Sequence, residues 1–158
     1  FNQYPIDHSE ANDMTVHSPL LKVLVQQVQE FLNEYEPIGN GERREAQLTA
    51  SGKLLVITNL PLPDGWNPDY VDVLIDVSSL PVKGIYVLND GFNGQEAALC
   101  QKFNLFRDSA YHEAEAIPGY TWICHIYPGN RWHLDANDPA RGDNLRKYLA
   151  LFLEKLES

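Results

Sequence analysis

Four strand-like runs follow one another between residues 45 and 89, and the segments that connect them are short. The runs cover residues 45–50, 53–60, 70–77 and 82–89. The third run alternates valine or isoleucine with other residues, which is the period of a half-buried strand. Parallel neighbours need crossover connections of about a dozen residues or more, whereas antiparallel strands are joined by short turns. The sequence therefore predicts a four-stranded antiparallel meander.

Amphipathic segments stand at both ends of the chain. Ser18 offers a hydroxyl N-cap and Pro19 suits the first helical position, so a helix is expected from there to Pro37. A second helix is expected to begin at Asp143 as its N-cap. Its apolar stripe consists of Leu145, Tyr148, Leu149, Phe152 and Leu156. This order of elements predicts an α+β domain in which an N-terminal and a C-terminal helix flank the sheet.

The remaining segments give weaker signals. Residues 1–17 lack the basic and apolar regions of a signal peptide and are interpreted as an N-terminal tail, so the domain is assigned to 18–158. Residues 95–106 are expected to form a short helix, and the apolar run 120–127 a buried strand that ends at Pro128.

Charge and cysteine content restrict the possible partners and the compartment. A formal net charge of −10 argues against a broad nucleic-acid-binding face, which would need clusters of Lys and Arg. No run approaches the roughly 18 apolar residues of a membrane helix. Two cysteines make no disulfide framework, and a reducing cytoplasm is the expected context.

The stretch 120-YTWICHIYPGNRWH-133 concentrates residues that could perform chemistry. In a functional interpretation Cys124 is a nucleophilic thiol, which requires a lowered pKa or a nearby base. His125, His133 and His112 are the available imidazoles. In the alternative interpretation, Cys124 is a small apolar residue on one face of a buried strand and His125 points to solvent on the other.

Two further chemistries involve the same residues. A zinc site from Cys100, His112, Cys124 and His125 matches no recurrent ligand spacing. A cysteine–histidine hydrolase has its imidazoles, but no third group is marked as orienting one of them. Cys100 lies among apolar neighbours and is expected to be buried.

The spacing around Cys124 resembles that of ubiquitin-conjugating enzymes. In that family a strand delivers an Ile-Cys or Leu-Cys pair and a tryptophan follows about eight residues later, as Trp132 does here. The divergent bacterial members are more similar still. They carry counterparts of three segments of this chain: 62-LPDGWN-67, 122-WICH-125 and 143-DNLRKYLALFLEKL-156. The resemblance covers residues 18–158.

The resemblance implies a ubiquitin-conjugating-enzyme-like (UBC-like) fold and a transferase activity in a bacterial cytoplasm. Cys124 would accept a ubiquitin-like protein as a thioester from an adenylating enzyme and pass it to an amine of a target protein. Such bacterial systems include anti-phage operons. No cofactor or metal is needed, because the adenylating enzyme consumes the ATP. The expected catalytic residues are Cys124, His125, His112 and Asn130, and the expected partner-binding residues are Trp132, Arg131 and Trp66.

One departure from the family keeps a second function open. Active ubiquitin-conjugating enzymes usually carry His-Pro-Asn before the cysteine, and its asparagine stabilises the oxyanion during transfer. The matching stretch here, 111-YHEAEAIPGY-120, has no asparagine, and Asn130 is the nearest later candidate. The alternative is a non-catalytic UBC-like module that binds a ubiquitin-like protein or its activating enzyme.

Overall fold

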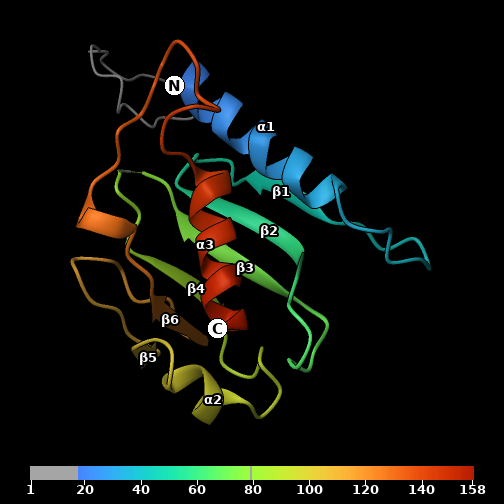
Figure 1. The fold of residues 1–158 in the computed structure, drawn as a ribbon. Coiled ribbons are helices and arrows are strands. Elements are labelled where there is room, and N and C mark those ends of the chain that lie inside the picture. Colours follow the sequence, from blue (N-terminus) through green and yellow to red (C-terminus); the bar gives the residue numbers. More distant parts are fainter. Residues whose placement is uncertain (1–17, 79) are drawn as a thin grey trace.

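A computed structural model describes residues 18–78 and 80–158, which form one antiparallel sheet and three α-helices (Figure 1). The tail expected at residues 1–17 lies outside the described residues. The strands are β1 (Glu45–Leu48), β2 (Leu54–Pro61), β3 (Tyr70–Asp76), β4 (Gly84–Leu88), β5 (Leu105–Arg107) and β6 (Tyr120–Cys124). The helices are α1 (Pro19–Asn33), α2 (Glu96–Cys100) and α3 (Leu145–Glu157).

The sheet has six strands in the order β1-β2-β3-β4-β6-β5, and every neighbouring pair is antiparallel. The expected meander is present as β1 to β4, but the expectation of four strands was wrong. After β4 the chain passes through α2 and the edge strand β5, then returns as β6 between β4 and β5. β5 is only three residues long, too short to show a period of two in the sequence.

Both long helices cover the same face of the sheet (Figure 1). The core lies between the helices and this face and is built from alternate residues of the strands. Its strand members include Leu55, Ile57, Val73, Ile75, Ile85, Val87 and Ile123, all nearly inaccessible to solvent. The predicted flanking of the sheet by an N-terminal and a C-terminal helix is therefore confirmed, with both helices on one side.

Helix α1 begins where the sequence predicts and ends earlier. Ser18 Oγ accepts a hydrogen bond from the Leu21 N–H at 3.3 Å, and Pro19 is the first helical residue. The helix ends at Asn33 rather than near Pro37. The buried face carries Leu21, Leu24, Val28, Phe31 and Leu32.

The N-cap of α3 is Asn144, not Asp143 as expected. Asn144 Oδ1 accepts from the Lys147 N–H at 2.8 Å, and its backbone is extended. Asp143 instead accepts from the Tyr127 hydroxyl at 2.7 Å and from the His133 N–H at 2.6 Å. Its carboxylate therefore fastens the segment before α3 to the segment after β6.

Helix α2 is shorter than the expected helix, because residues 105–107 form β5. Cys100, at its end, is exposed, so the expectation that it is buried was wrong. Among the residues that the structure describes, no helix is both long enough and apolar enough to cross a membrane.

Candidate functional site

Cys124 is the last residue of β6 and is half-buried. Its backbone N–H donates to the carbonyl of Asn104 at 3.0 Å, and it pairs with Gly84 of β4 across the sheet. Its side chain lines a depression of about 310 Å³ beside the end of α3, to which Cys100 and Lys155 also contribute. The thiol is therefore at a strand end that solvent can reach.

The surroundings of Cys124 do not favour its thiolate. Burial raises the pKa of the thiol above its ordinary value, and Lys155 lowers it by a smaller amount. A thiolate nucleophile needs a depressed pKa or an adjacent base. No imidazole lines the depression that holds Cys124.

His125 follows Cys124 in sequence, but its side chain is hydrogen-bonded to Tyr148 of α3. Its ring is buried, and Nε2 lies 3.0 Å from the carbonyl of Tyr148. Because a carbonyl can only accept, Nε2 carries the proton and donates. The Tyr148 hydroxyl donates back to the His125 carbonyl at 2.7 Å. Burial lowers the pKa of His125 to about 4, so the ring is neutral at physiological pH.

This reciprocal pair is the centre of an aromatic cluster. The rings of His125 and Trp132 lie 4.5 and 5.8 Å from the ring of Tyr148, and Trp132 also packs on Tyr127 at 5.4 Å. The Trp132 indole N–H is buried without a hydrogen-bond partner among the described residues. The cluster joins the end of β6 to the first turn of α3.

Trp66 also fastens α3. Its indole N–H donates to the carbonyl of Leu156 near the end of the helix at 3.1 Å, and its ring meets Phe92 edge-on at 5.5 Å. Trp66 and Trp132 are each about half-buried, so both expected partner-binding tryptophans are engaged in packing.

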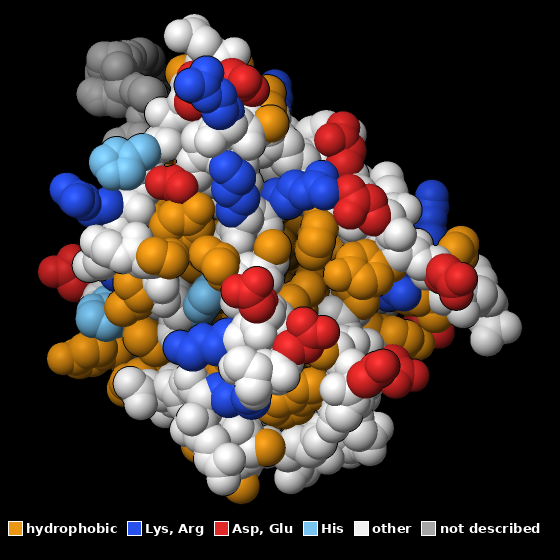
Figure 2. Space-filling view, in the orientation of Figure 1, with side chains coloured by type: hydrophobic (Ala, Val, Ile, Leu, Met, Phe, Trp, Pro, Cys, Tyr) orange, Lys and Arg blue, Asp and Glu red, His pale blue; other side chains and the backbone are white. Residues whose placement is uncertain are grey.

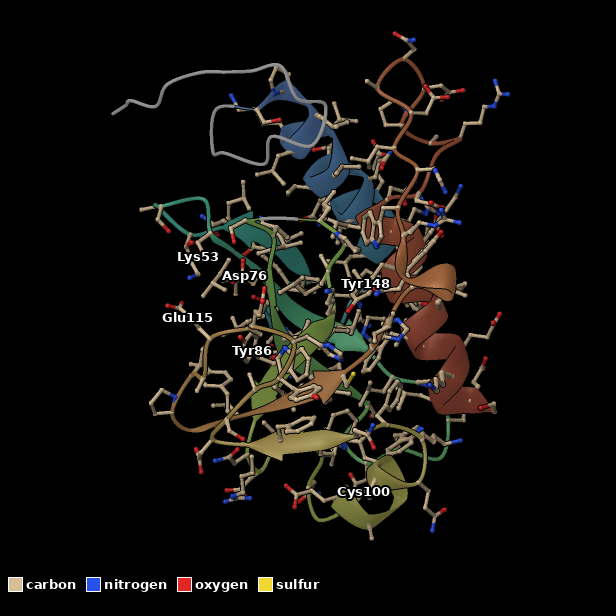
Figure 3. All side chains as sticks on the ribbon, turned by 90° about the vertical axis from the view of Figure 1, so that its left-hand side faces the viewer. Lys53, Asp76, Tyr86, Cys100, Glu115 and Tyr148 are labelled. Carbon is tan, nitrogen blue, oxygen red and sulfur yellow. The ribbon has the colours of Figure 1, made fainter. Side chains whose placement is uncertain are left out.

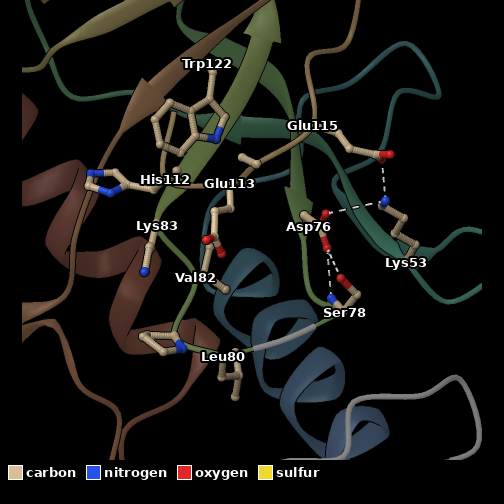
Figure 4. A pocket seen from close by; sticks show the side chains of 13 residues that line it. Lys53, Asp76, Ser78, Leu80, Val82, Lys83, His112, Glu113, Glu115 and Trp122 are labelled. Atoms are coloured by element: carbon tan, nitrogen blue, oxygen red, sulfur yellow. Dashed lines mark hydrogen bonds and ion pairs between the residues drawn. The ribbon is translucent and has the colours of Figure 1, made fainter. Parts of the chain in front are cut away.

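His112 lies in a different cavity from Cys124 (Figure 4). That cavity has a volume of about 350 Å³ and lies on the face of the sheet opposite the helices. Its floor includes the buried ring of Trp122, whose centroid is 6.2 Å from that of His112. The structure therefore does not bring His112 and Cys124 into one pocket.

Polar contacts fasten the segment between β5 and β6 over this cavity. Lys53 forms an ion pair with Glu115 and a second with Asp76 at 3.9 Å (Figure 4). The Tyr86 hydroxyl donates to the Glu115 carbonyl. Burial raises the pKa of Tyr86 to about 12, so it remains a donor. In Figure 3 these four labelled residues lie together, away from Tyr148 on the helical side.

The remaining predicted residues lie on exposed turns. Asn130 ends a short 3₁₀ turn (Pro128–Asn130) in the left-handed region at φ +53°, and its N–H donates to the Tyr127 carbonyl at 2.8 Å. Arg131 follows it and is exposed. Figure 2 shows both basic and acidic side chains spread over the helical face.

No three His, Cys, Asp or Glu side chains converge to hold a metal ion within residues 18–78 and 80–158. The zinc interpretation therefore has no ligand set there. Lys155 lines the depression beside Cys124 together with Lys102, and neither lysine is among the expected site residues. Lys155 lies in the last turn of α3, 31 residues further along the chain, and no local pattern marks that proximity.

Comparisons with protein-family models, with curated proteins and with solved structures found no match to this chain.

Proposed function

We propose that this chain is a UBC-like module that binds a ubiquitin-like protein or its activating enzyme without forming a thioester. The resemblance in sequence supplies the family and the partners. The main observation against catalysis is that neither Cys124 nor His125 is arranged to form a reactive thiolate. The thiol pKa is raised by burial, and the neighbouring imidazole donates to the Tyr148 carbonyl.

The positions of the motif residues support this proposal. His125, Trp132 and Tyr148 come from the segments that resemble bacterial UBC-like proteins, and the rings of His125 and Trp132 both pack on that of Tyr148. The rings pack together, and the side chains of His125 and Tyr148 each bond to the other residue's backbone carbonyl. These residues are therefore expected to preserve the fold whether or not a thioester forms. The module is expected in the cytoplasm, where both thiols would stay reduced.

A second candidate function is the thioester-forming transferase. The observation that favours it is the place of Cys124 at an open strand end beside Lys155, whose charge opposes the effect of burial on the thiol. In this function the Cys124 sulfur attacks the acyl carbonyl of the adenylate or thioester held by the activating enzyme, and AMP or that enzyme's thiol is released. A target amine then attacks the Cys124 thioester to form an amide, which releases the Cys124 thiol.

One experiment separates the two functions. The chain is mixed with ATP, a bacterial ubiquitin-like protein and the adenylating enzyme of that protein, and the products are run on a non-reducing gel. The proposal predicts no thiol-sensitive adduct, while a pull-down retains the partner on both the wild type and Cys124→Ala. A thiol-sensitive band that is absent from Cys124→Ala but present in Cys100→Ala would overturn the proposal in favour of the transferase.

A further inference from the structure

The cavity beside His112, of about 350 Å³, lies on the face of the sheet opposite the helices (Figure 4). We call it the sheet cavity. Residues 112–115 line one side of it, residues 80–84 line another, and the ring of Trp122 belongs to its floor. Its volume is within the range of ligand pockets, which begins at about 300 Å³. The proposed function makes no use of this cavity.

The indole N–H of Trp122 is an unused donor in the sheet cavity. Trp122 is only 1% exposed. Its N–H has no hydrogen-bond partner among the described residues, and it is not one of the unpartnered atoms that are sealed from solvent. The nitrogen edge of the ring lies against Gly84, where a Cβ would be 2.3 Å from Nε1. Because a buried donor normally has a partner, this N–H favours a ligand that brings an acceptor oxygen.

Carboxylates outnumber lysines among the charged residues of the sheet cavity, which are Lys53, Asp76, Lys83, His112, Glu113 and Glu115. Lys53 is already paired with Asp76 and Glu115. Neither Glu113 nor Lys83 forms an ion pair within the described part of the chain. The excess of carboxylates favours a ligand with a positive charge, and Glu113 is the carboxylate available to pair with it.

The backbone holds Glu113 in an uncommon conformation. His112 and Glu113 are consecutive non-glycine residues in the left-handed region, at φ +57° and +65°. Such strain persists only where surrounding contacts hold it, and it is concentrated at functional sites. Here Lys53 and the Tyr86 hydroxyl hold the segment through Glu115. In Figure 4 the Glu113 side chain extends into the cavity between Lys83 and Asp76.

We propose that the sheet cavity binds an α-ammonium group together with the carbonyl next to it, as at the N-terminus of a peptide or in a free amino acid. Glu113 pairs with the ammonium, and the Trp122 N–H donates to the carbonyl oxygen. The apolar wall of residues 80–82 receives an aliphatic side chain of the same unit. Binding is non-covalent, involves no part of the Cys124 depression and does not depend on the proposed function.

The test uses three small probes with the full chain: L-leucinamide, N-acetyl-L-leucinamide and isopentylamine. The indole N–H resonances are followed by NMR. Leucinamide is expected to shift the Trp122 resonance saturably, while that of Trp66, whose N–H already donates to the Leu156 carbonyl, stays in place. The acetylated probe lacks the charge and is expected to bind about tenfold more weakly. Isopentylamine lacks the carbonyl and is expected to leave the Trp122 resonance unshifted.

Three variants test the sign of the charge that the cavity recognises. Glu113→Gln is expected to weaken leucinamide about tenfold and to leave the acetylated probe unaffected. Glu154→Gln is the matched control, because Glu154 is exposed on α3 at the other face of the sheet, and it is expected to bind leucinamide as the wild type does. Lys83→Gln removes a charge that repels the ammonium, so it is expected to bind leucinamide at least as tightly as the wild type.

Equal binding of leucinamide and its acetylated form, an unshifted Trp122 resonance, or weaker binding of leucinamide by Lys83→Gln would overturn the inference. The last result would assign an anion to the cavity. Leu-Ala-Ala-amide and leucine then distinguish the two sources of the ligand. If the tripeptide binds at least as tightly as leucine, the ligand is the N-terminus of a peptide. Tighter binding of leucine assigns a free amino acid.

Discussion

Acidification should destabilise the protein through His125, and the structure sets the size of the effect. Burial lowers the pKa of His125 from 6.5 to about 4 in the folded chain. The unfolded chain keeps the ordinary value, so between these two pH values the unfolded state binds the extra proton. Stability is therefore unaffected by this group above pH 6.5 and falls as the pH decreases toward 4. At about 1.4 kcal/mol per pKa unit, the full loss is about 3 kcal/mol.

The measurement is urea unfolding followed by tryptophan fluorescence, at about pH 7.5 and about pH 4.5. Over that interval the linkage predicts a loss of about 2.5 kcal/mol in the free energy of unfolding from His125. His125→Gln keeps an N–H donor for the Tyr148 carbonyl and cannot titrate. On acidification, the free energy of unfolding of His125→Gln should therefore fall by about 2.5 kcal/mol less than that of the wild type. Carboxylates titrate in both proteins, so their contribution cancels in this difference.

His133→Gln is the matched control, because His133 is exposed. It should lose stability on acidification as the wild type does. Parallel losses in the wild type and His125→Gln would refute the buried, neutral state assigned to His125. Titration near pH 6.5 of the histidine C2 proton resonance that is absent from His125→Gln would refute it independently.

Three further predictions follow from single contacts. Tyr148→Phe should lower the free energy of unfolding by about 1–3 kcal/mol in urea denaturation, because the buried carbonyl of His125 loses its donor. Gly84→Ala should cost about 3 kcal/mol or prevent folding, as judged by circular dichroism, because a Cβ there would overlap the ring of Trp122. With limiting iodoacetamide near neutral pH, peptide mass spectrometry should find Cys100 alkylated before the half-buried second thiol, since Cys100 is exposed; the reverse order would contradict this.

Local signals were enough to predict the elements that depend on local physics. Ser18 caps α1 as expected, and the alternation of residues 70–77 corresponds to β3. The N-cap of α3 was displaced by one residue, because Asp143 and Asn144 are both good caps and tertiary contacts decide between them. The Asp143 carboxylate accepts a hydrogen bond from the Tyr127 hydroxyl and is not used as the cap.

The place of β6 could not be predicted, because it depends on pairing between distant segments. The chain forms α2 and β5 before it inserts β6 beside β4. A sequence shows which residues can form a strand, but a run that is buried on both faces carries no sign of its neighbours.

The contacts of single residues in the candidate site also could not be predicted, because they join distant parts of the sequence. Cys124 and His125 are adjacent in sequence, yet β6 ends between them and only Cys124 belongs to the strand. The imidazole of His125 bonds to the carbonyl of Tyr148, which is 23 residues away in sequence. Lys155 reaches the neighbourhood of Cys124 only because α3 packs beside the end of β6, and residue spacing does not reveal that contact.

The proposed function requires that the chain hold its partner without a covalent bond. Isothermal titration calorimetry with a bacterial ubiquitin-like protein, in the absence of ATP and activating enzyme, measures this binding. We expect saturable binding by the wild type and by Cys124→Ser, with dissociation constants that agree within about twofold. Absence of binding by both proteins, combined with a reducible wild-type adduct once ATP and the activating enzyme are added, would contradict it.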